Sequence, residues 1–560
     1  MKVSTRWQIL NKHVVNRIDE FQDVILANRH WTSRDLTQTL DWRELTPENL
    51  KIDPTQLQLA LERILQAREQ KQKVLIFGDY DVDGNGASAI AWQGLQTIGI
   101  QATPFIPHRF RHGYGMSVTA LEEICAASQP DLIITVDNGI TARPALEFCA
   151  ERGIDVIVTD HHQADQTQKK LPCLAIVQTT ALAGAGVAWF LMWQLGRKVL
   201  GDPKAQKLAQ SWLDLLALAT IVDQVPLVGF NRQLVKAGIV QLRQSKRPGI
   251  VALCQAAGLK QASLSTHDIG FSLGPRINAI GRLTNTLEAL RLLCTNKLAY
   301  AKTLAATLSN VNRSRQELTN EMFELACAQI DPEHLDKIVI VADQNFHEGI
   351  IGLIASKLVD TYHRPALAIA IGKEVAKGSA RSIEGFNITD FIRQFRAKLL
   401  DAGGHAMAAG FGLRPEMLKT VMDAMRECAN TQISDEQLIP TLTAETEVAP
   451  EVLFHPLVPA LLEQLEPFGP GNPEIAVVVT AKVFGVRQLG SEQQHLRVDL
   501  MCPGRRFLNV LVWNYRDHDI VPPKNGAVLQ VLGQLQINEY NGRRSPQLLA
   551  LDWHEASEAK

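Results

Sequence analysis

Residues 71–235 alternate between short apolar runs and longer segments with apolar residues at helical spacing. A strand followed by a helix, repeated several times, is typical of βαβ units, in which helices cover a parallel sheet. We therefore expect a parallel-sheet α/β domain in this region. The expected strands and helices are, in order, Val74–Phe77, Ala87–Ile98, Thr103–Ile106, Ser117–Ala127, Leu132–Val136, Arg143–Glu151 and Ile154–Thr159.

The regions on either side of this domain have mainly helical patterns. Residues 1–70 predict a helical lead-in, since Thr55–Glu69 carries leucine and isoleucine at helical spacing. Residues 236–335 predict a helical connector between domains. Its longest helix is expected from Asn285 to Ile330, a stretch without proline that ends before Asp331-Pro332.

The remaining two regions complete the predicted architecture. Residues 336–435 predict a second α/β domain, with the strands Ile338–Val341 and Ala366–Ile371 around a helix at Gly349–Leu358. Residues 436–560 change to short alternating runs separated by turn signals, which predicts a small OB-like β-barrel. The barrel strands are expected to include Val477–Val479, Leu496–Leu500, Leu508–Trp513, Val528–Gly533 and Gln547–Leu551.

Composition limits the class of protein. At 560 residues the chain is too long for a single hydrophobic core, and about three or four domains are expected. The start of the chain lacks the apolar core of a signal peptide, and the apolar stretches Val187–Leu195 and Leu213–Val222 are too short to span a bilayer. We therefore expect a cytoplasmic protein without a membrane partner. The eight cysteines include no CxxC pair, which favours reduced thiols over disulfides or a zinc site.

Three short polar motifs each follow a strand-like run of the first domain. They are Asp79–Gly84 (Asp-Tyr-Asp-Val-Asp-Gly), Asp137-Asn138-Gly139 and Asp160-His161-His162. Because the carboxyl ends of parallel strands meet at one edge of a sheet, we expect these side chains to converge where open α/β sheets bind ligands. Because this many anionic oxygens need cations to neutralise them, the sequence predicts a metal site.

The first motif also has a simpler interpretation. It can be an acidic surface turn, or a helix cap in which Asp83 caps the helix from Ala87. An EF-hand is excluded, because counting from Asp79 places Ile90 at the position where the calcium loop needs a glutamate.

The third motif and a later aspartate add to the expected site. One of His161 and His162 can bind a metal while the other contacts a phosphate or acts as a general acid. A mixed oxygen and imidazole shell suits Mn²⁺ better than Mg²⁺. Asp223 follows the apolar run Leu213–Val222 and is either a fourth metal-bridging acid or a helix end that opens to solvent.

These motifs together resemble the DHH phosphoesterase superfamily, and Gly403–Gly410 resembles the hallmark of its DHH-associated second domain. Further segments resemble the RecJ family of exonucleases, and the resemblance covers nearly the whole chain from about residue 70. These segments are Pro107-His108-Arg109, Gly113-Tyr114-Gly115, Gly274–Leu283, Asn312–Gln316, Glu348–Gly352, Gly378–Ser382 and Pro467–Pro473.

The resemblance implies an enzyme that hydrolyses single-stranded DNA from its 5′ end to mononucleotides, in DNA repair and recombination. It implies two Mn²⁺ or Mg²⁺ ions, which activate water and stabilise charge on phosphoryl oxygens. Asp79 and Asp160 can be ligands or can orient the ligands. The metal-binding set implied is Asp79, Asp81, Asp83, Asp137, His161 and Asp223, and the catalytic set is His162 and Asp160.

The resemblance also implies residues that hold the DNA strand. The second domain would close over the substrate and grip the phosphate next to the scissile one. Arg276 and Arg282 are expected in a glycine-punctuated loop. Barrel residues such as Phe507 and Trp513 are candidates for base stacking, with the barrel core as the alternative place for Trp513. The expected substrate-binding set is Arg109, Tyr114, Arg276, Asn278, Arg282, Arg381, Ser382, Gly403, Gly404 and His405.

Several features leave alternatives open. The sequence has Asn85-Gly86 where the family commonly has a threonine, and Gln178–Thr180 where it has Asn-Pro. A net charge of −2 argues mildly against a nucleic-acid binder, unless a local basic groove exists. A small-substrate DHH enzyme, such as an oligoribonuclease or a cyclic-dinucleotide phosphodiesterase, and a non-catalytic replication scaffold are the alternative functions. Besides single-stranded DNA, a single-strand-binding protein or a helicase is a candidate partner.

Overall fold

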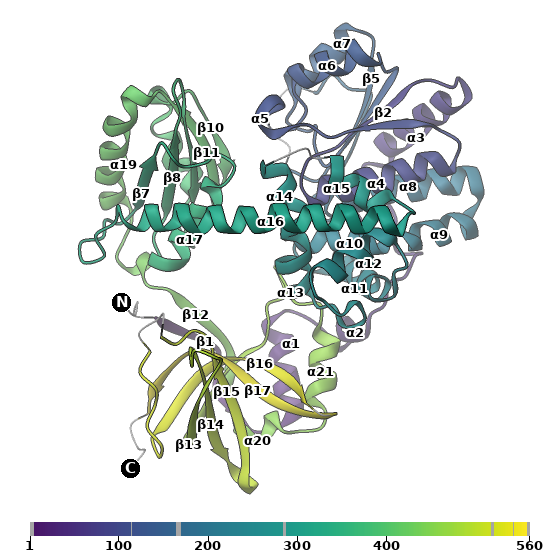
Figure 1. Ribbon diagram of the computed structural model, residues 1–560. Helices are drawn as coiled ribbons and strands as arrows, with labels where there is room; N and C mark the ends of the chain where they lie inside the picture. The colour runs from purple at the N-terminus through teal and green to yellow at the C-terminus, as the bar shows by residue number, and fades with distance from the viewer. Residues whose placement is uncertain are drawn as a thin grey trace. The chain divides into compact units, whose positions relative to one another are not determined.

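The structure is a computed structural model that describes residues 5–113, 115–163, 170–283, 287–516, 520–540 and 542–556 (Figure 1). It divides into two compact units. Unit 2 comprises residues 38–315 and 466–473 and contains the parallel sheet. Unit 1 comprises residues 1–37, 316–465 and 474–560 and contains two further sheets.

The sheet of unit 2 is parallel throughout, with the order β3-β2-β4-β5-β6. Its first strand, β2, lies between the second and third, so the chain reverses its direction of progress between β2 and β4. A crevice forms at the carboxyl ends of the strands at such a switch point. The strands are β2 (Val74–Phe77), β3 (Ala102–Phe105), β4 (Leu132–Val136), β5 (Asp155–Asp160) and β6 (Ala175–Gln178).

Helices cover both faces of this sheet, which explains why its central strands β2 and β4 are apolar at every position except Thr135. Ile76 and Ile134 point to the face that packs against α4 and α8, whereas Leu75 and Ile133 point to the face that packs against α6 and α7 (Figure 1). This alternation follows from the two-residue period of a strand. The helices of this region are α3 (Pro54–Glu69), α4 (Val82–Thr97), α5 (Arg109–His112), α6 (Val118–Ala127), α7 (Arg143–Glu151) and α8 (Gly184–Leu200).

A helical region follows the sheet in unit 2. Its helix α10 is buried along almost its whole length, and this explains the uninterrupted apolar run Leu213–Val222. Among the described helices, none combines the length and the hydropathy needed to cross a bilayer. The helices are α9 (Asp202–Ser211), α10 (Leu213–Val222), α11 (Gly229–Gln244), α12 (Pro248–Ala256), α13 (Thr266–Asp268), the π-helix Ile269–Leu273, α14 (Gly274–Leu283), α15 (Leu287–Cys294) and α16 (Leu298–Cys327).

Two expectations for this region were wrong. The segment with Arg276 and Arg282 is the helix α14 rather than a loop, since Pro275 lies in its first turn, where proline is tolerated. The long helix expected from residue 285 is divided into α15 and α16, because the chain breaks at Thr295, whose hydroxyl accepts a hydrogen bond from Lys297 N–H. Residues 284–286 lie outside the described residues.

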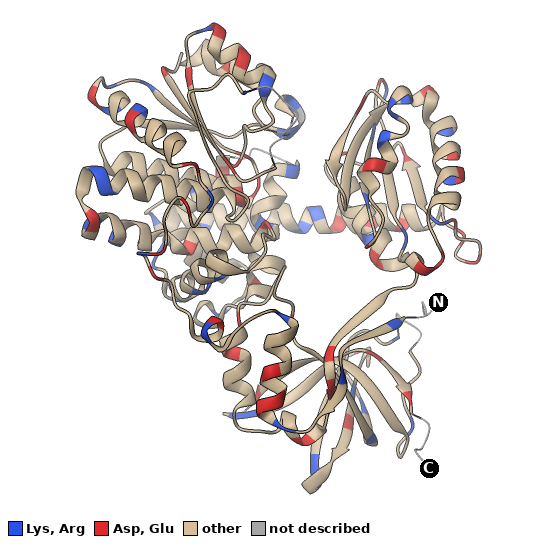
Figure 2. Ribbon diagram, turned by 180° about the vertical axis from the view of Figure 1, so that it is seen from behind, with Lys and Arg blue, Asp and Glu red and all other residues tan. Residues whose placement is uncertain are grey.

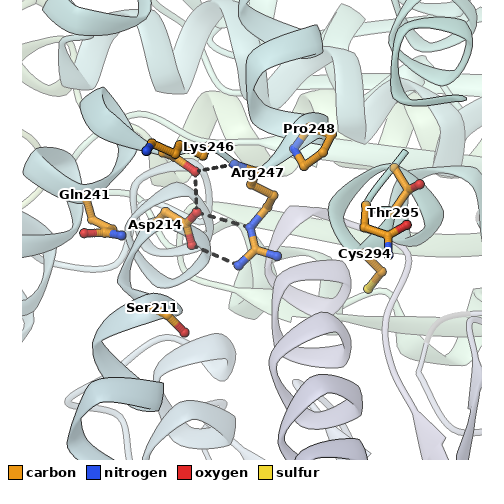
Figure 3. A pocket seen from close by; sticks show the side chains of 10 residues that line it. Ser211, Asp214, Gln241, Lys246, Arg247, Pro248, Cys294 and Thr295 are labelled. Atoms are coloured by element: carbon orange, nitrogen blue, oxygen red, sulfur yellow. Dashed lines mark hydrogen bonds and ion pairs between the residues drawn. The ribbon is translucent and has the colours of Figure 1, made fainter. Parts of the chain in front are cut away.

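A cavity of about 310 Å³ lies among these helices (Figure 3). A buried ion pair closes one side of it: Arg247 Nε lies 3.1 Å from Asp214 Oδ2, and Ser245 Oγ donates to the same oxygen at 2.8 Å. The cavity contains none of the acidic motifs described above. It is lined by Ser211, Asp214, Gln241, Ser245, Lys246, Arg247, Pro248, Cys294, Thr295 and Asn296.

The first sheet of unit 1 has the order β10-β11-β9-β8-β7, in which only β7 and β8 are parallel. The helix α17 packs against β8 and β9. The elements are β7 (Val339–Asp343), α17 (Ile351–Tyr362), β8 (Ala366–Ile371), β9 (Ala376–Arg381), α18 (Ile388–Arg393), β10 (Asp401–His405), β11 (Ala408–Leu413) and α19 (Leu418–Gln432).

The second sheet of unit 1 closes into a barrel. Its strands pair in the order β13-β14-β15-β17-β16, and β16 pairs back to β13. Five strands closed in this way, with β15 and β17 parallel, form an OB-type barrel. The strands are β13 (Ala476–Leu489), β14 (His495–Cys502), β15 (Arg506–Val512), β16 (Val528–Tyr540) and β17 (Arg543–Glu555), and the helices α20 (Pro450–Leu453) and α21 (Val458–Leu465) precede them.

The expectation of a helical lead-in over residues 1–70 was wrong for its first part. The strand β1 (Arg6–Val15) pairs with β12 (Thr441–Val448), which in turn pairs with β13. The following helices are α1 (Ile18–Asn28) and α2 (Ser33–Thr37). Beyond α1, Arg29 forms a buried ion pair with Glu445. Residues before 38 therefore belong to the unit that contains the barrel, whereas α3 packs against β6 in unit 2.

Candidate metal centre

The acidic motifs converge on the ring of His161. Its Nε2 atom lies 3.2 Å from Asp137 Oδ1, 3.5 Å from Asp223 Oδ2 and 3.7 Å from Asp83 Oδ2. These four residues follow β5, β4, α10 and β2, respectively. The expected convergence at the carboxyl edge of the sheet is therefore present, and Asp223 joins it rather than facing solvent alone.

Asp83 is fixed by the first turn of α8. Its Oδ2 accepts a hydrogen bond from Gly184 N–H at 2.7 Å, and its Oδ1 accepts one from Ala185 N–H at 2.8 Å. The N-terminus of a helix favours a negative charge, because its first N–H groups have no partner within the helix. The simpler interpretation of Asp83 as a helix cap was wrong, because Asp81 caps α4 by accepting a hydrogen bond from Gly84 N–H at 2.9 Å.

Asp137 is held by its backbone and by a close glycine. Its φ of +63° is unusual for an aspartate. A Cβ atom on Gly184 would lie 2.5 Å from Asp137 Oδ1, so only glycine leaves room for this carboxylate. The Oδ1 atom is buried and makes no hydrogen bond, and its described polar neighbour is the ring of His161.

Burial and mutual repulsion make these carboxylates hard to ionise. Burial, reinforced by the charge of Asp81, raises the pKa of Asp79 to about 8. Burial and then the charges of Asp83, Asp81 and Asp79 raise the pKa of Asp223 to about 9, and burial raises that of Asp137 well above its ordinary value. Such groups keep their charge only beside a cation.

The donor set fits a divalent cation. Buried oxygens without a hydrogen-bond donor, Asp79 Oδ2 and Asp137 Oδ1, belong to the same acidic group as the imidazole of His161. Single atoms of Asp83, His161 and Asp223 lie within 4.8 Å of one another, as do those of Asp137, His161 and His162. Carboxylate oxygens with imidazole nitrogen suit Mn²⁺, and carboxylates alone suit Mg²⁺.

Asp160 orients the histidines. Its Oδ1 accepts hydrogen bonds from the backbone N–H groups of His161 at 2.7 Å and His162 at 3.0 Å, and lies 2.8 Å from His162 Nδ1. Its Oδ2 accepts one from Ile140 N–H at 2.9 Å. Burial acts to raise the pKa of Asp160, but these donors, led by the His162 ring, outweigh burial and lower it. Both oxygens are therefore occupied by the chain, which favours an orienting role over a ligand role.

The same contact changes His162. The hydrogen bond with Asp160 raises the pKa of His162, although burial acts to lower it. The His161 and His162 rings lie with their centroids 4.5 Å apart. His162 thus holds a proton more readily than an ordinary histidine, next to the acidic centre.

The helix α14 and the residues after β3 surround the first motif. Val82 N–H donates a hydrogen bond to Asn278 Oδ1 at 2.9 Å, and the guanidinium of Arg109 lies 5.6 Å from the centre of the Tyr80 ring. Burial raises the pKa of Tyr80 to about 12, and the charge of Arg282 is among the lesser influences on it. Arg276 has a buried Nε atom without a hydrogen-bond partner. Tyr114 lies outside the described residues.

The two departures from the family pattern have structural consequences. A Cβ atom on Gly86 would lie 3.1 Å from that of Ala219, so glycine here allows α4 and α10 to pack closely. The hydroxyl of Ser88 is buried beside Gly78, one residue before Asp79. Gln178 Nε2 donates to the backbone oxygen of His162 at 2.9 Å, so the altered segment supports the third motif.

The five candidates in unit 1 fall into two environments. Strand pairing places Arg381 and His405 opposite Ala408 from either side, and Gly404 is next to this row. Gly403, Gly404 and His405 are exposed. The hydroxyl of Ser382, in contrast, is buried and donates to Phe386 O at 2.5 Å. Arg381 and His405 therefore lie in the same row at one end of the sheet, on either side of Ala408. The Ser382 hydroxyl instead stabilises the turn that leads to Phe386.

The aromatic residues of the barrel are mostly on its surface. Phe507 is 40% exposed, Trp513 50% and Tyr540 71%, which excludes Trp513 from the barrel core. The ring of Phe507 lies 4.6 Å from that of Phe484. The basic residues are interspersed with acidic ones, as they are along the rest of the chain (Figure 2). Arg497, for example, donates to Asp499 at 2.8 Å.

Sequence reasoning missed Gly184 and Ala185, whose N–H groups bind Asp83. A signal was present, because Gly184-Ala185-Gly186 begins an apolar helix and small residues there allow close approach. Tyr80 was also missed as a candidate site residue, although it lies inside the first motif and contacts Arg109.

Comparison with protein-family models gives three matches. Residues 73–220 match the DHH family, N-terminal domain; residues 335–431 match the DHHA1 domain; and residues 447–552 match the RecJ OB domain. The three matches follow the chain in the same order as the parallel sheet, the mixed sheet and the barrel.

Several curated relatives carry the name single-stranded-DNA-specific exonuclease RecJ. The protein from Haemophilus influenzae is 32% identical over 528 residues, covering 89% of this chain and 91% of its own length. That from Thermus thermophilus is 33% identical, covering 99% and 79%. That from Bacillus subtilis is 34% identical over 88% of this chain, and the chain spans only 62% of its length.

Solved structures show the same likeness. The crystal structure of RecJ in complex with Mn²⁺ from Thermus thermophilus matches with a TM-score of 0.82 at 30% identity, covering 99% of this chain and 80% of that chain. A crystal structure of exonuclease RecJ bound to manganese matches with a TM-score of 0.59 at 34% identity, covering 68% of this chain and 95% of that one.

Proposed function

The chain belongs to the RecJ family of single-stranded-DNA-specific exonucleases, and from this premise we propose that it hydrolyses single-stranded DNA from the 5′ end to mononucleotides. The observation that carries the proposal is the group of Asp83, Asp137 and Asp223 oxygens within 3.7 Å of His161 Nε2. A barrel of OB type in the same chain supports a strand rather than a dinucleotide as substrate, because a small substrate needs no additional binding module.

Two Mn²⁺ or Mg²⁺ ions are the proposed cofactors. The proposed ligands are Asp81, Asp83, Asp137, His161 and Asp223, with Asp79 as a further ligand or an orienting neighbour. When bound, the ions lower the pKa of water and offset charge on the phosphoryl oxygens.

The chain's own residues supply the remaining chemistry. His162, whose pKa is raised by its hydrogen bond with Asp160, is proposed to contact the phosphate or to donate a proton to the leaving oxygen. Asp160 holds that ring in place through Nδ1. The N–H groups of Gly184 and Ala185 hold the Asp83 carboxylate in place at the centre.

Substrate contacts are proposed in both units. In unit 2, Arg109, Asn278 and Arg282 lie around the first acidic motif, and the buried Nε of Arg276 lacks a partner that a phosphate would provide. In unit 1, Arg381 and His405, with the exposed backbone of Gly403 and Gly404, are proposed to bind the phosphate next to the scissile one. The Ser382 hydroxyl is occupied by its hydrogen bond to Phe386 O, so only the backbone of Ser382 is proposed to contact the phosphate.

The cellular role follows from the substrate. We propose that the enzyme acts in DNA repair and recombination in the cytoplasm. A single-strand-binding protein or a helicase is the proposed partner, because either one supplies or exposes single strands. The exposed barrel residues Phe507, Trp513 and Tyr540 are proposed to stack on bases.

The test is an end-labelled digestion with Mn²⁺ on DNA, RNA and dinucleotide substrates. The proposal predicts release of mononucleotides from the 5′ end of single-stranded DNA and slower cleavage of dinucleotides. Asp81→Ala should abolish hydrolysis and keep most of the strand binding. Release from 3′ ends only, or faster cleavage of dinucleotides than of long strands, would contradict it.

A further inference from the structure

Asp223 is held differently from Asp83 and Asp160. Asp83 and Asp160 accept hydrogen bonds from backbone N–H groups. Within the described part of the chain, the Asp223 carboxylate has no such donor, and its Oδ2 lies 3.5 Å from His161 Nε2. Its position is therefore set by its own backbone, at the end of α10 and in the turn that follows.

That turn leads directly into a contact with a distant loop. Gln224 has a φ of +59°, and Val225 N–H donates to Thr220 O at 3.3 Å, which ends the helix. Leu227, which is buried, then donates its N–H to Pro470 O at 2.7 Å. The turn is thus pinned to the loop Glu466–Pro473 only four residues after Asp223.

Two glycines of the loop pack closely against this turn. A Cβ atom on Gly469 would lie 2.8 Å from Leu227 Cδ1. A Cβ atom on Gly471 would lie 3.0 Å from Val228 Cγ1 and 3.3 Å from Pro226 Cβ, and Gly471 has a φ of +75°. These distances are shorter than ordinary van der Waals contacts, so a side chain at either position would force the neighbouring atoms of the turn to shift.

The loop is also rigid enough to act as a support. Gly469 and Asn472 exchange backbone hydrogen bonds of 2.9 and 3.0 Å. The Asn472 side chain is fully buried and donates from Nδ2 to Pro467 O at 2.8 Å. Arg232 Nη2, from α11, donates to Glu466 O at 3.1 Å. The loop packs as part of unit 2, although α21 before it and β13 after it belong to unit 1.

We propose that the loop Glu466–Pro473 is a positioning element that holds the Asp223 carboxylate at the metal centre. This inference rests on the proposed function, because it concerns the same centre. Gly469, Gly471 and Asn472 act through the turn 224–228 and touch neither metal nor DNA. Loosening the loop therefore lowers metal affinity and leaves the binding of DNA unchanged.

Gly471→Ala in the full-length protein tests the proposal, with the Mn²⁺ dissociation constant measured by titration calorimetry. We expect Mn²⁺ binding to weaken by about 10-fold or more, as for other residues that orient metal ligands. The KM for DNA should stay unchanged, and the cleavage rate should recover when the Mn²⁺ concentration is raised. Gly153→Ala is the matched control, since Gly153 has a φ of +66° and no atom within 4 Å of its added Cβ.

A second variant and a double variant make the result decisive. Gly469→Ala strains no backbone and decides the question if Gly471→Ala does not fold. In an Asp223→Asn background, either substitution should cost no further affinity, because the loop acts through Asp223. Affinity equal to that of Gly153→Ala, or an undiminished loss in the Asp223→Asn background, would overturn the proposal. Wild-type protein that binds Mn²⁺ but leaves DNA intact would instead contradict the proposed hydrolysis.

Discussion

Buried carboxylates are the residues on which the metal centre depends. Asp79 and Asp137 each have a buried oxygen without a hydrogen-bond donor, a cost that a protein seldom carries without a compensating ligand. Asp83 and Asp160 differ, because backbone N–H groups satisfy their oxygens. The centre therefore combines oxygens that the chain fixes in place with oxygens that it leaves for cations.

Stability should depend on pH when the protein is stripped of metal. The pKa of Asp79 rises from 3.8 to about 8, so between these values the folded protein keeps a proton that the unfolded chain has released. Stability then falls as pH rises through that range, and Asp223 extends it to about 9. Calorimetry should show a melting temperature that falls from acidic to alkaline pH in EDTA, and Mn²⁺ should restore it most at alkaline pH.

Asp223→Asn is the control for this pH dependence. The variant removes one of the groups with a raised pKa, so its melting temperature in EDTA should fall less steeply with pH than that of the wild type. A wild-type melting temperature that rises with pH in EDTA would contradict the assignment of these carboxylates as buried and protonated.

Asp160→Asn should alter the pH profile of cleavage. The substitution keeps the shape of the side chain but removes the charge that raises the pKa of His162. His162 then loses its proton at lower pH, so the alkaline limb of the rate profile should move to lower pH. The maximal rate should fall roughly 10–100-fold, as for other residues that orient metal ligands.

Asp155→Asn provides the comparison. Asp155 lies at the other end of β5 and pairs with Arg63, so it undergoes the same chemical change away from the centre. Its pH profile should match that of the wild type. An unchanged profile in Asp160→Asn would show that His162 does not depend on Asp160 for its proton.

At the scale of the element, the sequence predicted the buried strands best. The expected strands Val74–Phe77, Leu132–Val136 and Ala366–Ile371 are those observed, because a strand covered on both faces is almost entirely apolar. The strand β1 was missed, since Asn11 interrupts its alternating apolar pattern at the edge of a sheet. The helix α14 was also missed, because Gly274 and Pro275 indicate a loop unless they occupy a helix's first turn.

The sequence also predicted only part of the metal centre. Aspartates at strand ends could be predicted, because parallel strands bring their ends to one edge. The contact of Gly184 with Asp83 and Asp137 could not, because it depends on how α8 packs after the sheet has formed. Propensity and spacing carry no information about such a long-range contact.

Gly184→Ala tests the role of the first turn of α8. The added Cβ would lie 2.5 Å from Asp137 Oδ1 and would displace that carboxylate, so Mn²⁺ affinity should fall about 10–100-fold. Alanine favours a helix over glycine, so a loss cannot be attributed to a weaker helix. Gly196→Ala in the same helix is the control, since its Cβ would meet Ala205 Cβ at 3.3 Å. Equal Mn²⁺ affinity in the two variants would contradict the steric argument.

At the scale of the whole molecule, the two units are assembled from distant parts of the chain. The strand β1, near the start of the chain, extends the sheet of the barrel, and residues 466–473 belong to the unit that contains the metal centre. Each unit therefore needs a segment from the other end of the sequence, which domain boundaries drawn along the chain do not show.

Arg29→Ala tests the first of these exchanges. The variant leaves Glu445 buried without its ion-pair partner, and unfolding should become easier by about 3–5 kcal/mol. Arg17→Ala removes an exposed ion pair with Asp19 from the same segment and should have little effect. Chemical denaturation measures both. Equal stability of the two variants would show that the N-terminal segment is not anchored to β12.

Acidic residues and a histidine from distant parts of the sequence are proposed to bind the catalytic metal together. Anomalous diffraction from crystals soaked in Mn²⁺ tests this proposal most directly. We predict manganese peaks within bonding distance of His161 Nε2 and of the Asp83, Asp137 and Asp223 carboxylates. Manganese bound elsewhere, with no peak beside His161, would contradict the account.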